Sequence, residues 1–182
     1  MSDSDLDCIE YAGINGITQS CINGAMRYLQ EFDDPVTEAK VITYNKRHAF
    51  ILFTDERRKT IVVRAGFGSG YQGEGSSGFG YMLSRLDEFK VEIVEYDVPE
   101  RFFQRLNNGQ LTYKDLQKLE AKHPVRPHRI FDYIHEYSFP ARALEKRLPL
   151  PIPLRLVDER IRDLAIDFWT APGDRILTGF KR

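Results

Sequence analysis

The fold is decided by residues 40–65, KVITYNKRHAFILFTDERRKTIVVRA, within a chain of 182 residues. Three segments of this stretch are rich in valine, isoleucine, phenylalanine and threonine, a composition typical of strands. These segments are residues 40–44, 48–54 and 60–65. The breaks between them are polar and of hairpin length. The stretch therefore predicts an antiparallel meander of three strands.

Helical periodicity flanks the meander on both sides. Upstream, apolar residues spaced i, i+3, i+4 and i+7 predict a helix over residues 20–30. Downstream, an apolar stripe predicts a second helix over residues 79–89. Residues 91–98 then have the pattern of a strand that is apolar on both faces, which is typical of a central strand in a sheet.

The remainder of the chain is dominated by helical patterns. Three helices are predicted, at residues 100–106, 112–122 and 128–137, and Thr112 with Asp115 has the form of a capping box. A proline-rich connector at 149–153 precedes an amphipathic helix at 154–169. We therefore expect residues 1–182 to form a single α+β domain. Its small, mostly antiparallel sheet would consist of the three-strand meander plus one further strand, with a helical C-terminal half.

Composition narrows the class of protein. The formal net charge is −1 and the pI is about 6.4, so the strongly basic domain of a nucleic-acid-binding protein is absent and nucleic acid is an unlikely partner. No apolar run approaches the ~20 residues of a membrane span. The acidic N-terminus lacks the features of a secretory signal, and only two cysteines are present. These features predict a cytoplasmic protein without a membrane partner.

The most distinctive segment is a glycine tract, GFGSGYQGEGSSGFG, at residues 66–80, which contains seven of the chain's thirteen glycines. Ordering glycine costs backbone entropy, and bulkier residues interrupt the tract, so we expect a shaped functional loop that contacts a ligand or partner. The candidate contact residues are Arg64, Gly68, Ser69, Gly70, Tyr71, Gln72, Gly73, Glu74, Gly75, Ser76 and Ser77.

The pattern G-x-G-x-x-G occurs twice in the tract, over residues 68–73 and 73–78, and Asp97 follows the second copy by 19 residues. This order resembles a dinucleotide-binding fingerprint, in which the glycines approach a pyrophosphate and the acid holds a ribose. However, the tract does not follow the first predicted strand, and no further β-α units complete such a fold. We therefore expect no cofactor, and small-ligand binding, protein contact and a purely structural loop all remain open.

Catalytic and metal-binding patterns are weak. Neither Ser76 nor Ser77 has the flanking glycines of a nucleophile elbow. His128, Asp132 and His135 would share one helix face, but this face lies opposite the apolar residues, so a solvated surface is favoured over a metal site.

We therefore expect a non-enzymatic cytosolic binding or regulatory protein, of the accessory or immunity type. Its tract would contact a protein partner or a small anionic ligand, and the oligomeric state is open. The alternative is a nucleotide- or sugar-phosphate-handling enzyme that uses the same loop at a helix N-terminus. Whether the folded tract lines a concave pocket with converging polar groups or lies on a convex, flat surface would discriminate between the enzyme and the binding protein.

Overall fold

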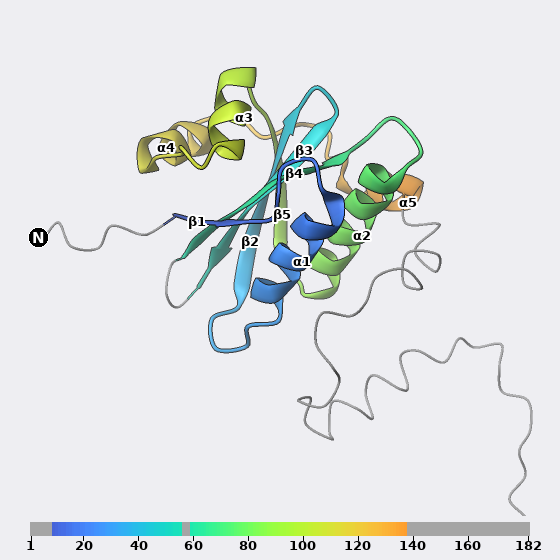
Figure 1. The fold of residues 1–182 in the computed structure, drawn as a ribbon, viewed down its shortest axis with the longest axis horizontal. Helices are drawn as coiled ribbons and strands as arrows, with labels where there is room; N and C mark the ends of the chain where they lie inside the picture. Colours follow the sequence, from blue (N-terminus) through green and yellow to red (C-terminus); the bar gives the residue numbers. More distant parts are fainter. Residues whose placement is uncertain (1–8, 56–58, 138–182) are drawn as a thin grey trace, which may run out of the picture. The chain divides into compact units, whose positions relative to one another are not determined.

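The computed structural model describes residues 9–55 and 59–137. All of these lie in one compact unit of the chain, Met1–Pro149. The predicted connector at 149–153 and helix at 154–169 lie outside the described residues. The described elements in chain order are β1 (Ile9–Ala12), α1 (Thr18–Leu29), β2 (Val36–Tyr44), β3 (Arg47–Thr54), β4 (Thr60–Gly68), α2 (Glu74–Glu88), β5 (Glu92–Asp97), α3 (Glu100–Asn107), α4 (Tyr113–Glu120) and α5 (Ile130–Tyr137) (Figure 1).

The five strands form one mixed sheet in the order β1-β4-β3-β2-β5. The predicted meander is confirmed, because β2 pairs antiparallel with β3 and β3 pairs antiparallel with β4. The prediction of a mostly antiparallel sheet is wrong: β1 runs parallel to β4, and β5 runs parallel to β2. A helix joins each outer strand to the meander, and such a helical crossover returns the chain in the direction of the preceding strand.

The expected segregation of helices into the C-terminal half is also wrong. Helices α1 and α2 belong to the N-terminal half and, together with α5, cover one face of the sheet (Figure 1). Helices α3 and α4 cover the other face. Strand β5 was expected to be central but lies at an edge. It carries apolar side chains on both faces, Ile93 on one and Val94 and Tyr96 on the other, because helices cover the sheet on both sides.

Two hydrophobic cores follow from alternation along the strands. In β3, Phe50 and Leu52 belong to the core beneath α1 and α2, and Ile51 belongs to the core beneath α3 and α4. All three side chains have no exposed area. Successive strand residues point to opposite faces, so one fully apolar strand supplies both layers.

The turn between β2 and β3 contains only Asn45 and Lys46, and Tyr44 pairs with Arg47 across it. Both turn residues are left-handed, with φ values of 47° for Asn45 and 61° for Lys46. This is the geometry of a type I′ hairpin, which matches the twist of the flanking strands.

The glycine tract divides between three elements. Strand β4 continues to Gly68, and α2 begins at Glu74, five residues before the predicted start of that helix. Only residues 69–73 form a loop between these two elements. The prediction that the whole tract is a loop is therefore corrected: five of its seven glycines lie in a strand or a helix.

Candidate functional site

Two glycines of the tract permit close packing of α1. A Cβ atom at Gly66 would lie 2.6 Å from the Sγ atom of Cys21, and a Cβ atom at Gly78 would overlap the methyl group of Thr18. Gly66 lies in β4 and Gly78 in α2, so α1 approaches both elements more closely than any larger residue would allow. These glycines serve the fold, as expected where two backbones approach closely.

Other glycines make room for the aromatic ring of Tyr71. A Cβ atom at Gly68 would lie 2.7 Å from the hydroxyl oxygen of Tyr71, and a Cβ atom at Gly75 would overlap the same atom. The hydroxyl of Ser76 donates to the carbonyl oxygen of Tyr71 at 2.6 Å. The ring therefore lies across the glycines of its own tract, and the side chain of Tyr71 is still 54% exposed.

Gly70 is the residue of the tract with a left-handed backbone, at φ +77°. Its amide donates to the hydroxyl oxygen of Tyr137 in α5 at 2.6 Å. The aliphatic stem of Lys46 lies against it, because a Cβ atom at Gly70 would meet the Cδ atom of Lys46 at 2.9 Å. The loop is thus held between the β2–β3 turn and α5.

A groove of about 400 Å³ opens beside the tract. Backbone of the tract forms much of its wall, and charged or aromatic side chains also line it. Its lining includes Gly16, Lys46, Arg47, Gly68, Tyr71 and Glu74. The tract therefore borders a concave surface with converging polar groups, an arrangement typical of small-ligand sites.

The charges of this groove are not neutralised within the described part of the chain. There, Lys46, Arg47 and Glu74 form none of the ion pairs found in the structure. The guanidinium of Arg47 lies over the ring of Phe103, 5.3 Å from its centroid, and donates a long hydrogen bond of 3.4 Å to Asn15. Arg47 is thus positioned by contacts that leave its charge uncompensated.

Exposed apolar side chains lie next to the same groove. Ile14 is 57% exposed and Ile17 is 48% exposed. They flank Gly16 in the turn before α1, and an isolated β-bridge pairs the two isoleucines. Gly16 and Thr18, which are next to Ile17 in the chain, line the groove together with Tyr71, Lys46 and Arg47, so the two isoleucines belong to a segment that borders the groove.

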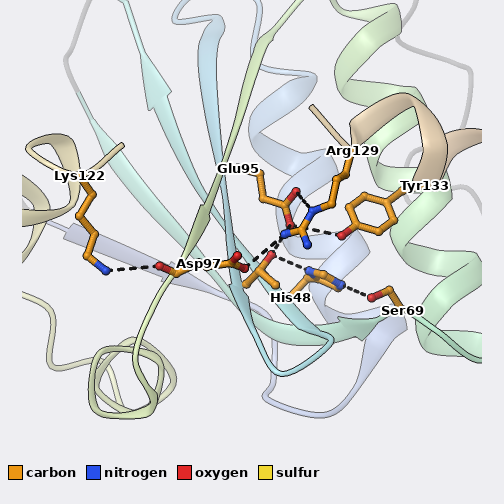
Figure 2. A network of polar contacts seen from close by, with 8 residues as sticks. His48, Ser69, Glu95, Asp97, Lys122, Arg129 and Tyr133 are labelled. Atoms are coloured by element: carbon orange, nitrogen blue, oxygen red, sulfur yellow. Dashed lines mark hydrogen bonds and ion pairs between the residues drawn. The ribbon is translucent and has the colours of Figure 1, made fainter. Parts of the chain in front are cut away.

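A buried polar network lies behind the loop (Figure 2). The Nε2 atom of His48 lies 2.8 Å from the hydroxyl oxygen of Ser69, and its Nδ1 atom lies 2.9 Å from the hydroxyl oxygen of Thr43. Thr43 in turn donates to the carboxylate of Glu95 at 2.7 Å. An ionised carboxylate only accepts hydrogen bonds, so the Thr43 proton points to Glu95. His48 must then donate from Nδ1 and accept the Ser69 hydroxyl at Nε2.

Burial keeps this histidine neutral. His48 has no exposed area, and its ring stacks on Phe79 with 4.0 Å between ring centroids. Desolvation lowers the pKa of His48 to about 3, and the positive charge of Arg129 acts in the same direction. Glu95 is only 1% exposed and forms an ion pair with Arg129 at 2.8 Å. Burial, followed by the charge of Glu95, raises the pKa of Tyr133 to about 12.

The Ser69–His48 pair has the hydrogen-bond polarity of a nucleophile and its base. Its surroundings do not suit catalysis, because His48 is sealed between Phe79 and Tyr133 and Ser69 is only 7% exposed. The network instead fastens the loop to the sheet. Ser69, predicted as a contact residue, is placed as an anchor.

Arg64, the first predicted contact residue, is also engaged within the fold. It donates from Nε to the carbonyl oxygen of Asn107 at 3.1 Å and from Nη1 to that of Gly13 at 2.9 Å. Its guanidinium also lies over the ring of Tyr11. Arg64 thereby ties β4 to the end of α3 and to the turn after β1.

The other candidates divide between surface and interior. Exposed positions are Gly70, Tyr71, Gln72, Gly73 and Glu74, whereas Gly75 and Ser77 are half-buried, and Gly68 and Ser76 are buried. Sequence reasoning missed Lys46, Arg47, Ile14 and Ile17. One local signal could have pointed to Lys46: a two-residue hairpin beginning with asparagine usually continues with glycine.

Two further properties concern only the described residues. Within residues 9–55 and 59–137, no three histidine, cysteine, aspartate or glutamate side chains gather as a metal site would require. His128 precedes α5, whereas Asp132 and His135 lie within it and are exposed. In the same part of the chain, no helix combines the length and apolar character needed to cross a bilayer.

Comparison with known proteins gives a fold relationship. No protein-family model matches the sequence, and no curated protein sequence matches it. Among solved structures, a chain of respiratory complex I from Thermus thermophilus is similar, with a TM-score of 0.52 and 18% sequence identity. The match covers 69% of this chain and 99% of the other. At this identity the similarity concerns the fold alone.

Proposed function

We propose that this protein is a non-catalytic binding module that docks a protein partner on the surface around the glycine-tract groove. We call this surface the docking face and define it by Ile14, Ile17, Lys46, Arg47 and Tyr71. The observation that carries the proposal is the gathering of exposed apolar side chains and uncompensated cations beside one concave surface. Aromatic, aliphatic and arginine side chains in such an arrangement are typical of the centre of protein interfaces.

Rigidity supports the same function. The loop that carries Tyr71 is held by Ser69 bonded to His48 and by Gly70 bonded to Tyr137. A surface that is already ordered loses less conformational entropy when it binds, so more of the contact energy appears as affinity. The buried network therefore contributes to binding by fixing the shape of the docking face.

The similar chain from Thermus thermophilus is part of respiratory complex I, so a chain with a comparable fold functions there inside an assembly. An accessory role beside other proteins is in keeping with this, and we propose it for the present chain in a cytoplasmic setting.

The second candidate is the binding of a small anionic ligand, as in an enzyme that handles nucleotides or sugar phosphates. The observations that favour it are Lys46 and Arg47 beside the start of α2, since a helix N-terminus also attracts anions. Glu74 opposes it, because this carboxylate lines the same groove and repels phosphate. We therefore rank it below protein docking.

Site-specific photo-crosslinking in cells tests the proposed function. A photoreactive phenylalanine analogue replaces Tyr71 in one variant and Tyr113 in a matched control, because Tyr113 is 63% exposed on α4, which covers the opposite face of the sheet. We expect a discrete adduct with another protein at position 71 only, abolished by a second change, Ile17→Asp. Equal adducts at both positions, or none at position 71, would refute the docking face. A melting-temperature increase with ATP or phosphate would favour the second candidate.

A further inference from the structure

Lys46 occupies a backbone conformation that suits another residue better. It is the second residue of the β2–β3 turn, with φ +61°, where a side chain is strained and glycine is favoured. Asn45, at φ 47°, is the kind of residue that tolerates the left-handed region. A strained residue that persists invites a search for what its side chain does.

The structural contacts of Lys46 do not require a lysine. Its carbonyl oxygen accepts a hydrogen bond from the amide of Ser69 at 2.9 Å, and any residue could provide this. Its aliphatic stem covers Gly70, with no ion pair for the ammonium among the described residues. What the lysine side chain adds beyond these contacts is a positive charge beside the groove.

Arg47 places a second cation directly beside the first. Its position over Phe103 and its contact with Asn15 restrict the guanidinium before anything binds. Two neighbouring, restricted cations suit one or two carboxylates, which arginine binds through paired N–H groups.

The remaining surroundings narrow the class of ligand. Glu74 lines the same groove and would repel a ligand that is negatively charged throughout, such as a polyphosphate or nucleic acid. Ile14 and Ile17 are exposed apolar side chains that only an apolar group would cover with a gain in free energy. The face thus fits a ligand that carries negative charge in one part and apolar groups in another.

We infer that the docking face binds a peptide segment of its partner that combines acidic and apolar side chains, and that Lys46 and Arg47 read its carboxylates. This inference rests on the proposed function, because it specifies what the docking face recognises. Lys46 is the specificity-determining residue, retained in a strained turn for its charge.

Selection from a phage library of random eight-residue peptides, with the full chain immobilised, tests the inference. The wild type is expected to enrich peptides that contain aspartate or glutamate together with leucine, isoleucine or phenylalanine. Lys46→Gly is expected to lose the acidic enrichment. Lys90→Gly is the matched control, because Lys90 is another exposed, left-handed lysine, at φ +60°, at the end of α2 and outside the residues that line the groove. It should retain the wild-type selection.

Fluorescence anisotropy with the best selected peptide then measures affinity. We expect binding to weaken about tenfold when Lys46 becomes glycine and about tenfold when the peptide's glutamates become glutamines, the size of one charge-assisted contact. Both glycine variants should melt at or above the wild-type temperature, so unfolding cannot account for the loss. Added salt should weaken the wild-type complex.

Each contrary outcome has a distinct meaning. If the wild type selects peptides that are not enriched in acidic residues, and Tyr71→Ala weakens the binding of these peptides, the inference is overturned but the docking face stands. If the wild type selects no peptide, both the inference and the proposed docking face are overturned. The same holds if Tyr71→Ala and Lys46→Gly select the same peptides as the wild type. Tight binding of ATP that Lys46→Gly abolishes would assign the cations to a nucleotide and overturn the inference.

Discussion

Acid should lower the unfolding free energy of this protein mainly through protonation of His48, and far less through changes in its exposed charges. The unfolded chain binds a proton at the ordinary histidine pKa of about 6.5. The folded chain binds it only near pH 3, because the imidazole has no exposed area and loses solvation. The unfolded state therefore binds more protons between these two values, so the contribution of His48 is complete above pH 6.5 and is lost as the pH falls toward 3.

The magnitude follows from the size of the pKa difference. A separation of about 3.5 units between 6.5 and about 3, at ~1.36 kcal/mol per unit, corresponds to roughly 5 kcal/mol of unfolding free energy. This is a large fraction of the 5–15 kcal/mol that is typical of a whole domain. One buried imidazole is therefore expected to dominate acid unfolding.

The assay is urea unfolding, followed by circular dichroism at several pH values from 7 to 3, for the wild type and His48→Gln. Glutamine keeps a donor and an acceptor near Thr43 and Ser69 but stays neutral, so the difference between the two curves isolates the titration of His48. The control, His135→Gln, removes an exposed imidazole. The expected result is a gap between wild type and His48→Gln that narrows by several kcal/mol on acidification. Parallel curves over the whole range would refute the reasoning.

Three further predictions concern stability and reactivity. Gly78→Ala should lower the unfolding free energy measured by urea titration by about 2 kcal/mol, because the new methyl group would overlap Thr18 and force α1 away from α2. An unchanged midpoint would contradict the close approach of the two helices. Cys21 should resist iodoacetamide until the protein unfolds, as read by peptide mass spectrometry, because burial raises its pKa to about 11; rapid native labelling would argue against its buried position. Glu95→Gln should lower the unfolding free energy, measured by thermal melting, by about 2 kcal/mol, because the ion pair between the buried carboxylate and half-exposed Arg129 is lost. A variant as stable as the wild type would show that this ion pair does not stabilise the fold.

Local sequence patterns predicted much of the secondary structure. The apolar spacing at Ile22, Ala25 and Met26 predicted α1, and segments rich in β-branched and aromatic residues, separated by short polar breaks, predicted the three strands of the meander. The capping box of Thr112 and Asp115 is present at the start of α4. These features depend on neighbours within about four residues, so the sequence by itself determines them.

Sheet topology depended on distant parts of the chain. Strand β1 has only four residues, too few for a clear alternation, and it is stabilised by parallel pairing with β4. Whether β5 joins the sheet in parallel or antiparallel fashion is decided by where α2 packs, not by any residue of β5. The mixed sheet therefore could not be read from strand patterns alone.

The candidate site shows the same division. The glycine tract and Tyr71 stood out in the sequence because glycine is so concentrated there. The tertiary structure alone separated glycines that permit close packing, such as Gly78, from backbone that borders the groove. Lys46 and Arg47 are identified as site residues only from the tertiary structure, because the pairing of Arg47 with Gly68 places the β2–β3 turn beside the end of β4. The interactions that shape this site join residues far apart in sequence, as when Thr43 bonds Glu95 across 52 positions, and no local pattern records such contacts.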